Sequence, residues 1–538
     1  MTPPRRRVWA LGIEGPSHEL LLRWIAGGQL PNLARFRQRS AAFTIESEKK
    51  FSNEHCWIPV LTGRRAERWD HWLDHWNPQT YRFSEASLMD WLQAPLFYAL
   101  GKQRTVVAFD LTAPVGAGVQ GVQVSGWASE LNESFPASEP PELLAQLLAR
   151  HGHDPKLASG ASTITNQLSM REGVSHVIPT MYDTALLQDY AARQVRSVQR
   201  RVAACDDILS GMAWDLFITS FSETHTAGHL LWHLSQPHAL QALKEDVPDP
   251  MLAIYLAVDH AVGHFIEQAG PDDAIVVFTA DSMGPDCLEN ARAVLLPEFV
   301  YRWNFPGKAA LADGIPGTSA PDARFDFTQH WKHEVWKLRT PTGDSELESP
   351  ASQEARQDAM SWCPANWYAP LWPRMRAFAL PTVADGYVRI NVRGREAQGL
   401  VGKDEYAAVC DELARDISAL VNARTGQPLV REVIRVRESP FDSDPKKPPA
   451  DLIVVFHEDG PVDTADSPRF GRIGPLPFFR TGSHPAHGSV MRNLMYVAAP
   501  GIEPGERQEV ARLEDLPATL LSLLGLDVPA QFDGVARN

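Results

Sequence analysis

The segment from Trp214 to Leu234 reads WDLFITSFSETHTAGHLLWHL. Its first part, Trp214–Phe221, is an apolar run rich in aromatic and β-branched residues, which predicts a buried strand. His225 and His229 follow this strand directly and stand four residues apart. Side chains at positions i and i+4 share a face on a helix or tight turn, so this spacing suits two imidazole ligands of one metal ion. The same spacing is common on ordinary helix surfaces, and the position after a strand is what favours the metal interpretation.

Strand, loop and helix alternate on both sides of this segment. Arg7–Ile13 predicts a buried strand followed by a helical stretch over Ser17–Phe36, and Thr105–Phe109 predicts another strand. Leu252–Gln268 is helical in pattern and leads to a further buried strand at Ala274–Ala280. This order predicts an α/β fold with a mainly parallel central sheet and helices on both faces. In such sheets, sites form outside the carboxyl ends of the strands, where the polar residues stand here.

The composition narrows the function classes. The 538 residues include 51 Lys+Arg and 66 Asp+Glu, a formal net charge of −15, which argues against non-specific nucleic-acid binding. Five scattered cysteines without a CxxC pair argue against a disulfide framework and against a thiolate zinc site. No apolar stretch approaches 18 residues, so no membrane-spanning helix is expected. We therefore expect a cytoplasmic protein with no membrane association.

The regular alternation is interrupted between about residues 295 and 381, where the chain is rich in Pro, Trp and charge. We interpret this stretch as an insertion that caps a site, with a surface excursion as the alternative. The sequence thus predicts a core formed by residues 1–294 and 382–538, with a cap at 295–381.

A second histidine-rich segment lies near the C-terminus. Residues 480–488 read RTGSHPAHG, a glycine-flanked turn in which His484 or His487 could supply a third imidazole. Three protein ligands with an open fourth position are typical of catalytic zinc sites. A turn with incidental histidines is the alternative.

Two carboxylates stand at the ends of other predicted strands. Asp281 follows Ala274–Ala280 in ADSMGP, and Glu14 ends the first strand in GIEG. Each could be a metal ligand, a general base or a helix cap.

The segment FSNEHCWIPVLTG, residues 51–63, places polar residues before an apolar helical run. The N–H groups at such a helix start can bind an anion. A nucleophile, a base or an oxyanion donor could be among Ser52, Asn53, Glu54 and His55, and the residues alone do not choose between these roles.

Taken together, these segments resemble the alkaline phosphatase superfamily, in particular its type I phosphodiesterase/nucleotide pyrophosphatase branch. The resemblance spans nearly the whole chain, through motifs in the following order: GIEG with GGQLPNLARF; NEHCWIPVLTG; SETHTAGHLLWHL; DSMGP; GYVRINVRGRE; GSHPAHG with YVAAPGIEPG; and EDLPATLLSLLGLDVP with the final DG. It implies an alkaline-phosphatase-like core with two zinc-type ions at the strand ends and a Thr or Ser nucleophile on the helix between them.

The chain departs from that pattern at several positions. By the resemblance, Glu14 stands for the first-strand Asp, Asn53 for the nucleophile with Ser52 beside it, and His225 for a ligand Asp. The partner histidine His229 and the terminal histidine His484 are retained, which implies a three-histidine site. The family's Asp-His pair corresponds to Ala280–Asp281, which leaves a poorer second site of Glu14 and Asp281, with Asn53 or Glu54.

We therefore expect a metal-dependent hydrolase of phosphodiesters or related phosphorus or sulfur esters. The metal is expected to be zinc, with manganese or iron as alternatives, in one or two ions. Ser52, Asn53 and Glu54 are the candidate catalytic residues, and His55, Glu223 and His487 are candidates for substrate contact. The substrate is expected to be a small anion, and the sequence leaves a homodimer open.

Two alternatives follow from the exchanged residues. A metal-dependent transferase, lyase or specialised biosynthetic enzyme would explain concerted changes at Glu14, Asn53 and His225. A non-catalytic binding protein on the same scaffold would explain why Asn53 and Ala280 stand at positions where the family has a nucleophile and a metal ligand. Under this alternative, no metal binds.

Overall fold

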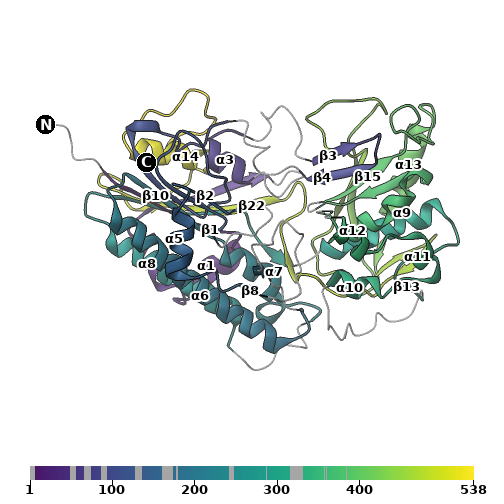
Figure 1. The fold of residues 1–538 in the computed structure, drawn as a ribbon, viewed down its shortest axis with the longest axis horizontal. Coiled ribbons are helices and arrows are strands. Elements are labelled where there is room, and N and C mark those ends of the chain that lie inside the picture. Colours follow the sequence, from purple (N-terminus) through teal and green to yellow (C-terminus); the bar gives the residue numbers. More distant parts are fainter. Residues whose placement is uncertain are drawn as a thin grey trace.

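A computed structural model shows the arrangement of the chain. It describes residues 6–48, 56–65, 74–85, 94–127, 136–159, 174–176, 180–240, 248–285, 288–315, 331–356, 358, 360–382 and 385–537. The chain forms two lobes, and the first and last described strands and helices, coloured purple and yellow, lie in the lobe that contains the large sheet (Figure 1).

The larger lobe is built on a nine-stranded sheet. Its strands, in spatial order, are β23 (Gly505–Glu506), β2 (Ala41–Glu48), β22 (Val490–Ala498), β11 (Ala274–Ala280), β1 (Val8–Glu14), β10 (Leu216–Phe221), β5 (Thr105–Phe109), β6 (Gln120–Ser125) and β7 (Ala137–Glu139). The five strands from β11 to β6 are parallel, and β22 and β7 pair antiparallel at their two sides. This confirms the predicted α/β fold with a mainly parallel sheet.

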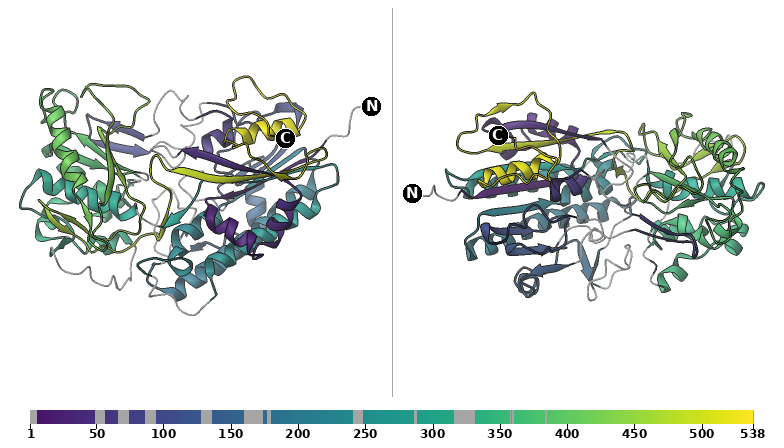
Figure 2. Two further views of the ribbon diagram at one scale, coloured as in Figure 1. Left: turned by 180° about the vertical axis from the view of Figure 1, so that it is seen from behind. Right: turned by 90° about the horizontal axis from the view of Figure 1, so that it is seen from above.

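Helices cover both faces of this sheet because its central strands carry apolar side chains on both faces. Along β1, Trp9, Leu11 and Ile13 pack on one face, while Val8 and Ala10 pack on the other. The first face carries α1 (His18–Ala26), α2 (Pro31–Gln38), α5 (Leu143–His151), α6 (Thr184–Gly211), α7 (Glu223–Ser235) and α8 (Pro250–Gln268). The opposite face carries α3 (Trp57–Thr62) and α14 (Asp515–Leu523), and Figure 2 shows the two groups separated by the sheet.

The second lobe has its own core and its own sheets. Four antiparallel strands form one sheet in the order β14 (Ala377–Leu380), β15 (Gly386–Ile390), β18 (Leu452–Phe456) and β17 (Val430–Arg435). A smaller sheet has the order β13 (Asp313–Gly314), β20 (Gly471–Ile473), β19 (Ala465–Ser467) and β16 (Val421–Asn422). The helices of this lobe include α9 (Leu296–Asn304), α10 (Trp331–Trp336), α11 (Pro341–Glu346), α12 (Pro350–Ala355) and α13 (Tyr406–Ser418).

The structure corrects the predicted extent of the cap. Residues 382–538 were expected to return to the core, but β15 and β18 pair with β14 in the second lobe. The chain rejoins the large sheet only at β22. The hairpin of β3 (Asp74–Asn77) and β4 (Arg82–Glu85) also lies in this lobe, where the Trp76 ring centroid is 5.3 Å from that of Phe378. A buried apolar strand has the same composition in either sheet, so the sequence pattern does not assign it to one.

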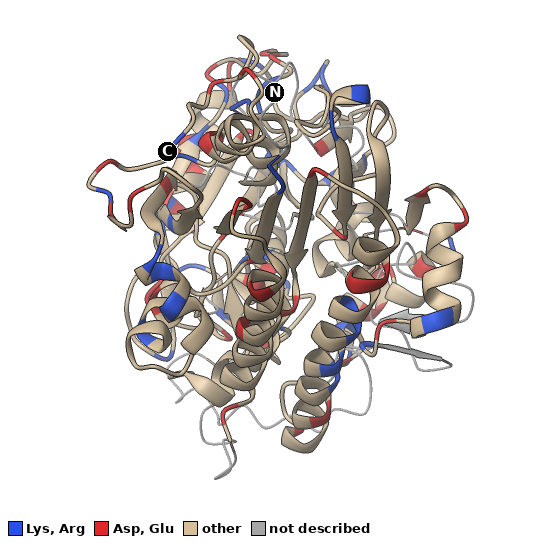
Figure 3. Cartoon of the chain, turned by 90° about the vertical axis from the view of Figure 1, so that its left-hand side faces the viewer, with Lys and Arg blue, Asp and Glu red and all other residues tan. Residues whose placement is uncertain are grey.

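Charged residues of both signs occur together on the face of the large lobe that includes α6 and α8 (Figure 3). Within the described part of the chain, no helix combines the length and apolar character needed to span a membrane.

The fully buried Arg201 connects helix α6 to the end of strand β5 and to the start of helix α7. Arg201, on α6, lies 2.9 Å from an Asp110 carboxylate oxygen at the end of β5 and 3.3 Å from Glu223 at the start of α7. Ser197 Oγ lies 2.8 Å from the same Glu223 carboxylate. The network therefore fixes the first turn of α7 against α6 and β5.

Replacing Arg201 with Ala should lower the free energy of unfolding by about 3–5 kcal/mol, because two carboxylates would remain buried without their cation. Arg150 is a matched control, since its pair with Asp207 is at the surface and its loss should cost no more than about 1 kcal/mol. Urea denaturation of both variants measures the difference. Equal stability of the two variants would contradict the anchoring role of Arg201.

Candidate metal centre

The ends of three neighbouring strands define the site. β1 lies between β10 and β11, with Ile13 opposite Phe221 and Glu14 opposite Ala280. Glu14, the start of α7 and Asp281 are therefore brought to the same edge of the sheet. This is the carboxyl edge at which open α/β sheets place their sites.

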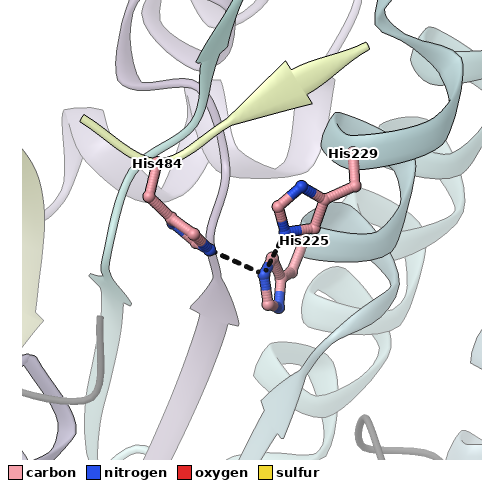
Figure 4. A group of neighbouring side chains, drawn as sticks. All are labelled: His225, His229 and His484. Atoms are coloured by element: carbon pink, nitrogen blue, oxygen red, sulfur yellow. Dashed lines mark hydrogen bonds between the residues drawn. The ribbon is translucent and has the colours of Figure 1, made fainter. Parts of the chain in front are cut away.

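Three imidazoles from two distant segments meet at this edge (Figure 4). His225 and His229 lie on α7, and His484 follows the short strand β21 (Gly482–Ser483). The His225 Nε2 atom is 3.0 Å from His229 Nε2 and 3.0 Å from His484 Nε2. All three side chains are buried, being 5%, 1% and 8% exposed.

Close packing of backbone brings His484 to α7. The Thr481 N–H donates to the His229 carbonyl at 2.7 Å, and β21 pairs with β12 (Gly284–Pro285). A Cβ atom at position 482 would lie only 2.2 Å from the Gly228 carbonyl oxygen, so only glycine allows this approach. Gly15 has φ of +54°, and a Cβ atom there would lie 2.9 Å from the His225 Cβ. The glycines noted in the two motifs thus create room for the histidines.

Each imidazole has an oxygen beside its Nδ1 atom. His229 Nδ1 is 2.7 Å from the Gly482 carbonyl oxygen, and His484 Nδ1 is 2.9 Å from an Asp281 carboxylate oxygen. His225 Nδ1 is 3.6 Å from Glu14 Oε1. Assigned from this network, the Nδ1 hydrogens of His229 and His484 are donated to these oxygens. Their Nε2 atoms therefore present lone pairs toward the common point, as metal-binding histidines do.

The surroundings of His229 keep its imidazole neutral. Burial, together with the Arg480 guanidinium and the neighbouring His225 and His484, holds the pKa of His229 well below its ordinary value. The imidazole is therefore neutral, and its lone pair is available to a Lewis acid. The candidate ligand atoms of the three histidines lie within 4.8 Å of one another, and the residues described here contain no other such group of three or more His, Cys, Asp or Glu.

The two carboxylates predicted as ligands of a second ion lie beside imidazoles in the structure. Glu14 is at the Nδ1 side of His225 and also accepts a hydrogen bond of 3.2 Å from Thr112 Oγ1. Asp281 is at the Nδ1 side of His484. These positions suit partners that orient ligands, and a direct role of either carboxylate in a second metal site stays a prediction.

The other predicted site residues have different outcomes. Ser52, Asn53, Glu54 and His55 lie outside the described residues, and their roles stay predictions. Glu223 was expected to contact substrate, but its side chain is fully buried and paired with Arg201, so the structure does not support that role. His487 is not part of the three-histidine group, and its backbone N–H donates to Asp385 at 3.3 Å.

Sequence reasoning missed Arg480. Its Nη1 atom is 3.2 Å from His229 Nε2 and 3.5 Å from Glu289 Oε1. Arg480 is the first residue of the RTGSHPAHG segment. Its position, four residues before the predicted ligand His484, could have indicated a cationic side chain near the site.

Comparisons with known proteins agree on the architecture. No protein-family model and no curated protein matches the chain. Among solved structures, the alkaline phosphatase PafA matches over 100% of this chain and 99% of its own, with 11% identity and a TM-score of 0.52. The chain has the alkaline phosphatase fold. Phosphonoacetate hydrolase from Sinorhizobium meliloti 1021 matches with 14% identity over 97% of this chain and 96% of its own, with a TM-score of 0.45. Murine ectonucleotide pyrophosphatase/phosphodiesterase 5 matches with 11% identity over 97% and 96%, with a TM-score of 0.39. The likeness to PafA over the whole chain confirms, as a fold, the alkaline-phosphatase-like core inferred from the motifs.

A fourth histidine supports the same helix from within the core. His233 Nδ1 lies 3.0 Å from Thr481 Oγ1, one helical turn beyond His229. Burial lowers the pKa of His233 to about 4. Because it stays neutral in the folded protein, it packs against the segment that leads to His484 without adding charge.

The pKa of His233 predicts a loss of stability in acid. The unfolded chain binds a proton at this histidine below about pH 6.5, whereas the folded chain does so only below about pH 4. Its contribution to the free energy of unfolding should therefore fall by about 3 kcal/mol as the pH drops from 6.5 to 4. Denaturation of the wild type and of His233→Gln between pH 6.5 and pH 4 measures this change in the free energy of unfolding. If the free energy of unfolding of the variant depends on pH as steeply as that of the wild type, the lowered pKa of His233 is not the cause.

Proposed function

We propose that this protein is a metal-dependent hydrolase of phosphodiesters or related phosphorus or sulfur esters. The observation that carries the proposal is the convergence of three imidazole Nε2 atoms, each ring having an oxygen beside its Nδ1 atom. The likeness to the alkaline phosphatase PafA supports the class of reaction through the fold.

The donor set fits a zinc-type ion. Tetrahedral zinc with Zn–N distances of 2.0–2.1 Å separates its nitrogen ligands by about 3.3 Å. Two of the three Nε2 separations here are 3.0 Å, close to that value. Manganese and iron also accept imidazole ligands and are the alternatives. When bound in such a site, the ion polarises a substrate oxygen and lowers the pKa of a coordinated water.

The residues of the chain have separate tasks in this proposal. His225, His229 and His484 hold the ion, while Glu14, Asp281 and the Gly482 carbonyl oxygen keep the rings in the required tautomer and orientation. The segment before α3 supplies the groups that meet the substrate. In it, Asn53 orients the substrate oxyanion, Ser52 is the alternative nucleophile, and Glu54 or His55 moves protons.

A second candidate is a transferase, a lyase or another metal-dependent reaction on the same scaffold. It is favoured by His225, which stands where the resemblance implies a carboxylate and which is paired with Glu14. Three neutral ligands leave more positive charge on the metal than two histidines and an aspartate would. Retained metal with no hydrolysis of phosphate, phosphonate or sulfate esters would favour this candidate. The cytoplasmic location, the small anionic substrate and the homodimer stay predictions.

The His229→Ala variant tests the proposal most simply. It should lose zinc and ester hydrolysis together, because it removes one of three ligands. His487→Ala is the matched control, since it removes a histidine from the same C-terminal turn that lies outside the cluster, and it should keep the zinc. Metal content by mass spectrometry and diesterase assays measure both, with circular dichroism to confirm folding. Unchanged activity in His229→Ala would contradict the proposed site.

The Asp281→Asn variant tests the orienting role of the carboxylate. It should reduce zinc affinity by about 10–100-fold, because the amide holds the His484 imidazole less firmly. Asp459→Asn, at an exposed carboxylate beside His457, should leave the affinity unchanged. Chelator competition gives the zinc dissociation constants of both variants. If the two variants bind zinc equally tightly, Asp281 does not support the centre.

A further inference from the structure

Arg480 lies in contact with the candidate metal centre. Its Nη1 atom donates to His229 Nε2 at 3.2 Å, and the same atom is 3.5 Å from Glu289 Oε1. The guanidinium also lies 5.3 Å from the centroid of the Phe479 ring. The side chain is 21% exposed, so an incoming solute can reach it.

This contact uses the lone pair that a metal ion needs. The Nδ1 atom of His229 faces the Gly482 carbonyl oxygen, so Nε2 is the only nitrogen of this ring directed at the cluster. A lone pair that accepts an N–H from Arg480 cannot simultaneously bind a cation. The guanidinium also carries a positive charge, which opposes a second cation at short range. Metal binding by His229 therefore requires Arg480 to move.

The surroundings give Arg480 a reason to stay near the centre after it moves. Glu289 is buried and also pairs with Arg292, which in turn donates to the Thr382 carbonyl oxygen. This fixed carboxylate can keep the guanidinium at the edge of the site. An oxyanion beside the histidines would offer the guanidinium two acceptor oxygens in its preferred fork geometry, in place of one imidazole nitrogen.

We propose that Arg480 couples the binding of a small oxyanion to the binding of metal at the three-histidine centre. Without the anion, the guanidinium donates a hydrogen bond to His229 Nε2 and blocks its lone pair. When a phosphate-like or sulfate-like group is present, the guanidinium pairs with that group, and His229 Nε2 becomes available to the metal. This inference rests on the metal centre in the proposed function. Because coupling between two sites is reciprocal, the metal must strengthen anion binding by the same factor.

Zinc affinity measured by chelator competition, with and without inorganic phosphate, tests the coupling in the full chain. In the wild type, phosphate should tighten zinc binding by about fivefold or more, within the usual range of coupling between sites. Arg480→Gln, which removes the charge and the fork, should bind zinc more tightly than the wild type without phosphate. Its gain from phosphate should be clearly smaller. Arg480→Lys keeps the charge but loses the fork, so it should also show a reduced gain.

Arg356→Gln is the matched control, because Arg356 pairs with Glu348 at the surface of the second lobe and should behave as the wild type. Sulfate and a neutral sugar replace phosphate in parallel titrations, and only the oxyanions should act. Wild-type zinc affinity in Arg480→Gln, or an undiminished gain from phosphate, would overturn the coupling while leaving the metal centre intact. Failure of the wild type to bind zinc under any condition would instead overturn the proposed function, and this inference with it.

Discussion

The approach of the segment 481–484 to helix α7 is the contact on which the site depends. The Thr481 N–H donates to the His229 carbonyl, and His229 Nδ1 is hydrogen-bonded to the Gly482 carbonyl. There is no room for a side chain at position 482, because it would collide with the Gly228 carbonyl oxygen. These backbone contacts bring together imidazoles that are more than 250 residues apart in the chain. They also satisfy the outward nitrogen of one ring, and so direct its lone pair inward.

The second lobe takes part in the site through this same segment. Residues between β11 and β22 form most of that lobe, and the chain passes the strand ends on its way out at Asp281 and on its way back at His484. The hydrogen bond from His484 Nδ1 to the Asp281 carboxylate therefore links the departing and the returning chain. Arg480 and its partner Glu289 lie next to the same two crossings. A change in the position of the second lobe would thus reach the histidines directly through covalent structure.

Much of the fold could be predicted because the signals were local. The apolar runs at Val8–Glu14, Leu216–Phe221 and Ala274–Ala280 have the composition of strands buried on both faces, and the structure pairs them side by side. The extent of the cap could not be predicted, since β15 and β18 are equally apolar and local composition does not select a partner strand. At the site, helical spacing pointed to His225 and His229, and the glycine-flanked turn pointed to His484 or His487. The family resemblance then selected His484 as the third histidine. The positions of Glu14 and Asp281 beside imidazole Nδ1 atoms could not be predicted, because they depend on the directions of the side chains. The burial of Glu223 could not be predicted either, because it depends on pairing with Arg201, 22 residues away in the chain.

The central claim is that His225, His229 and His484 bind one metal ion through their Nε2 atoms. Anomalous diffraction at the zinc absorption edge, from crystals grown with zinc, tests it most directly. The account predicts a peak enclosed by the three Nε2 atoms, with Asp281 and Glu14 on the far sides of their rings. Zinc-containing crystals without a peak at this position, or with a peak bound by the two carboxylates and none of the imidazoles, would contradict it.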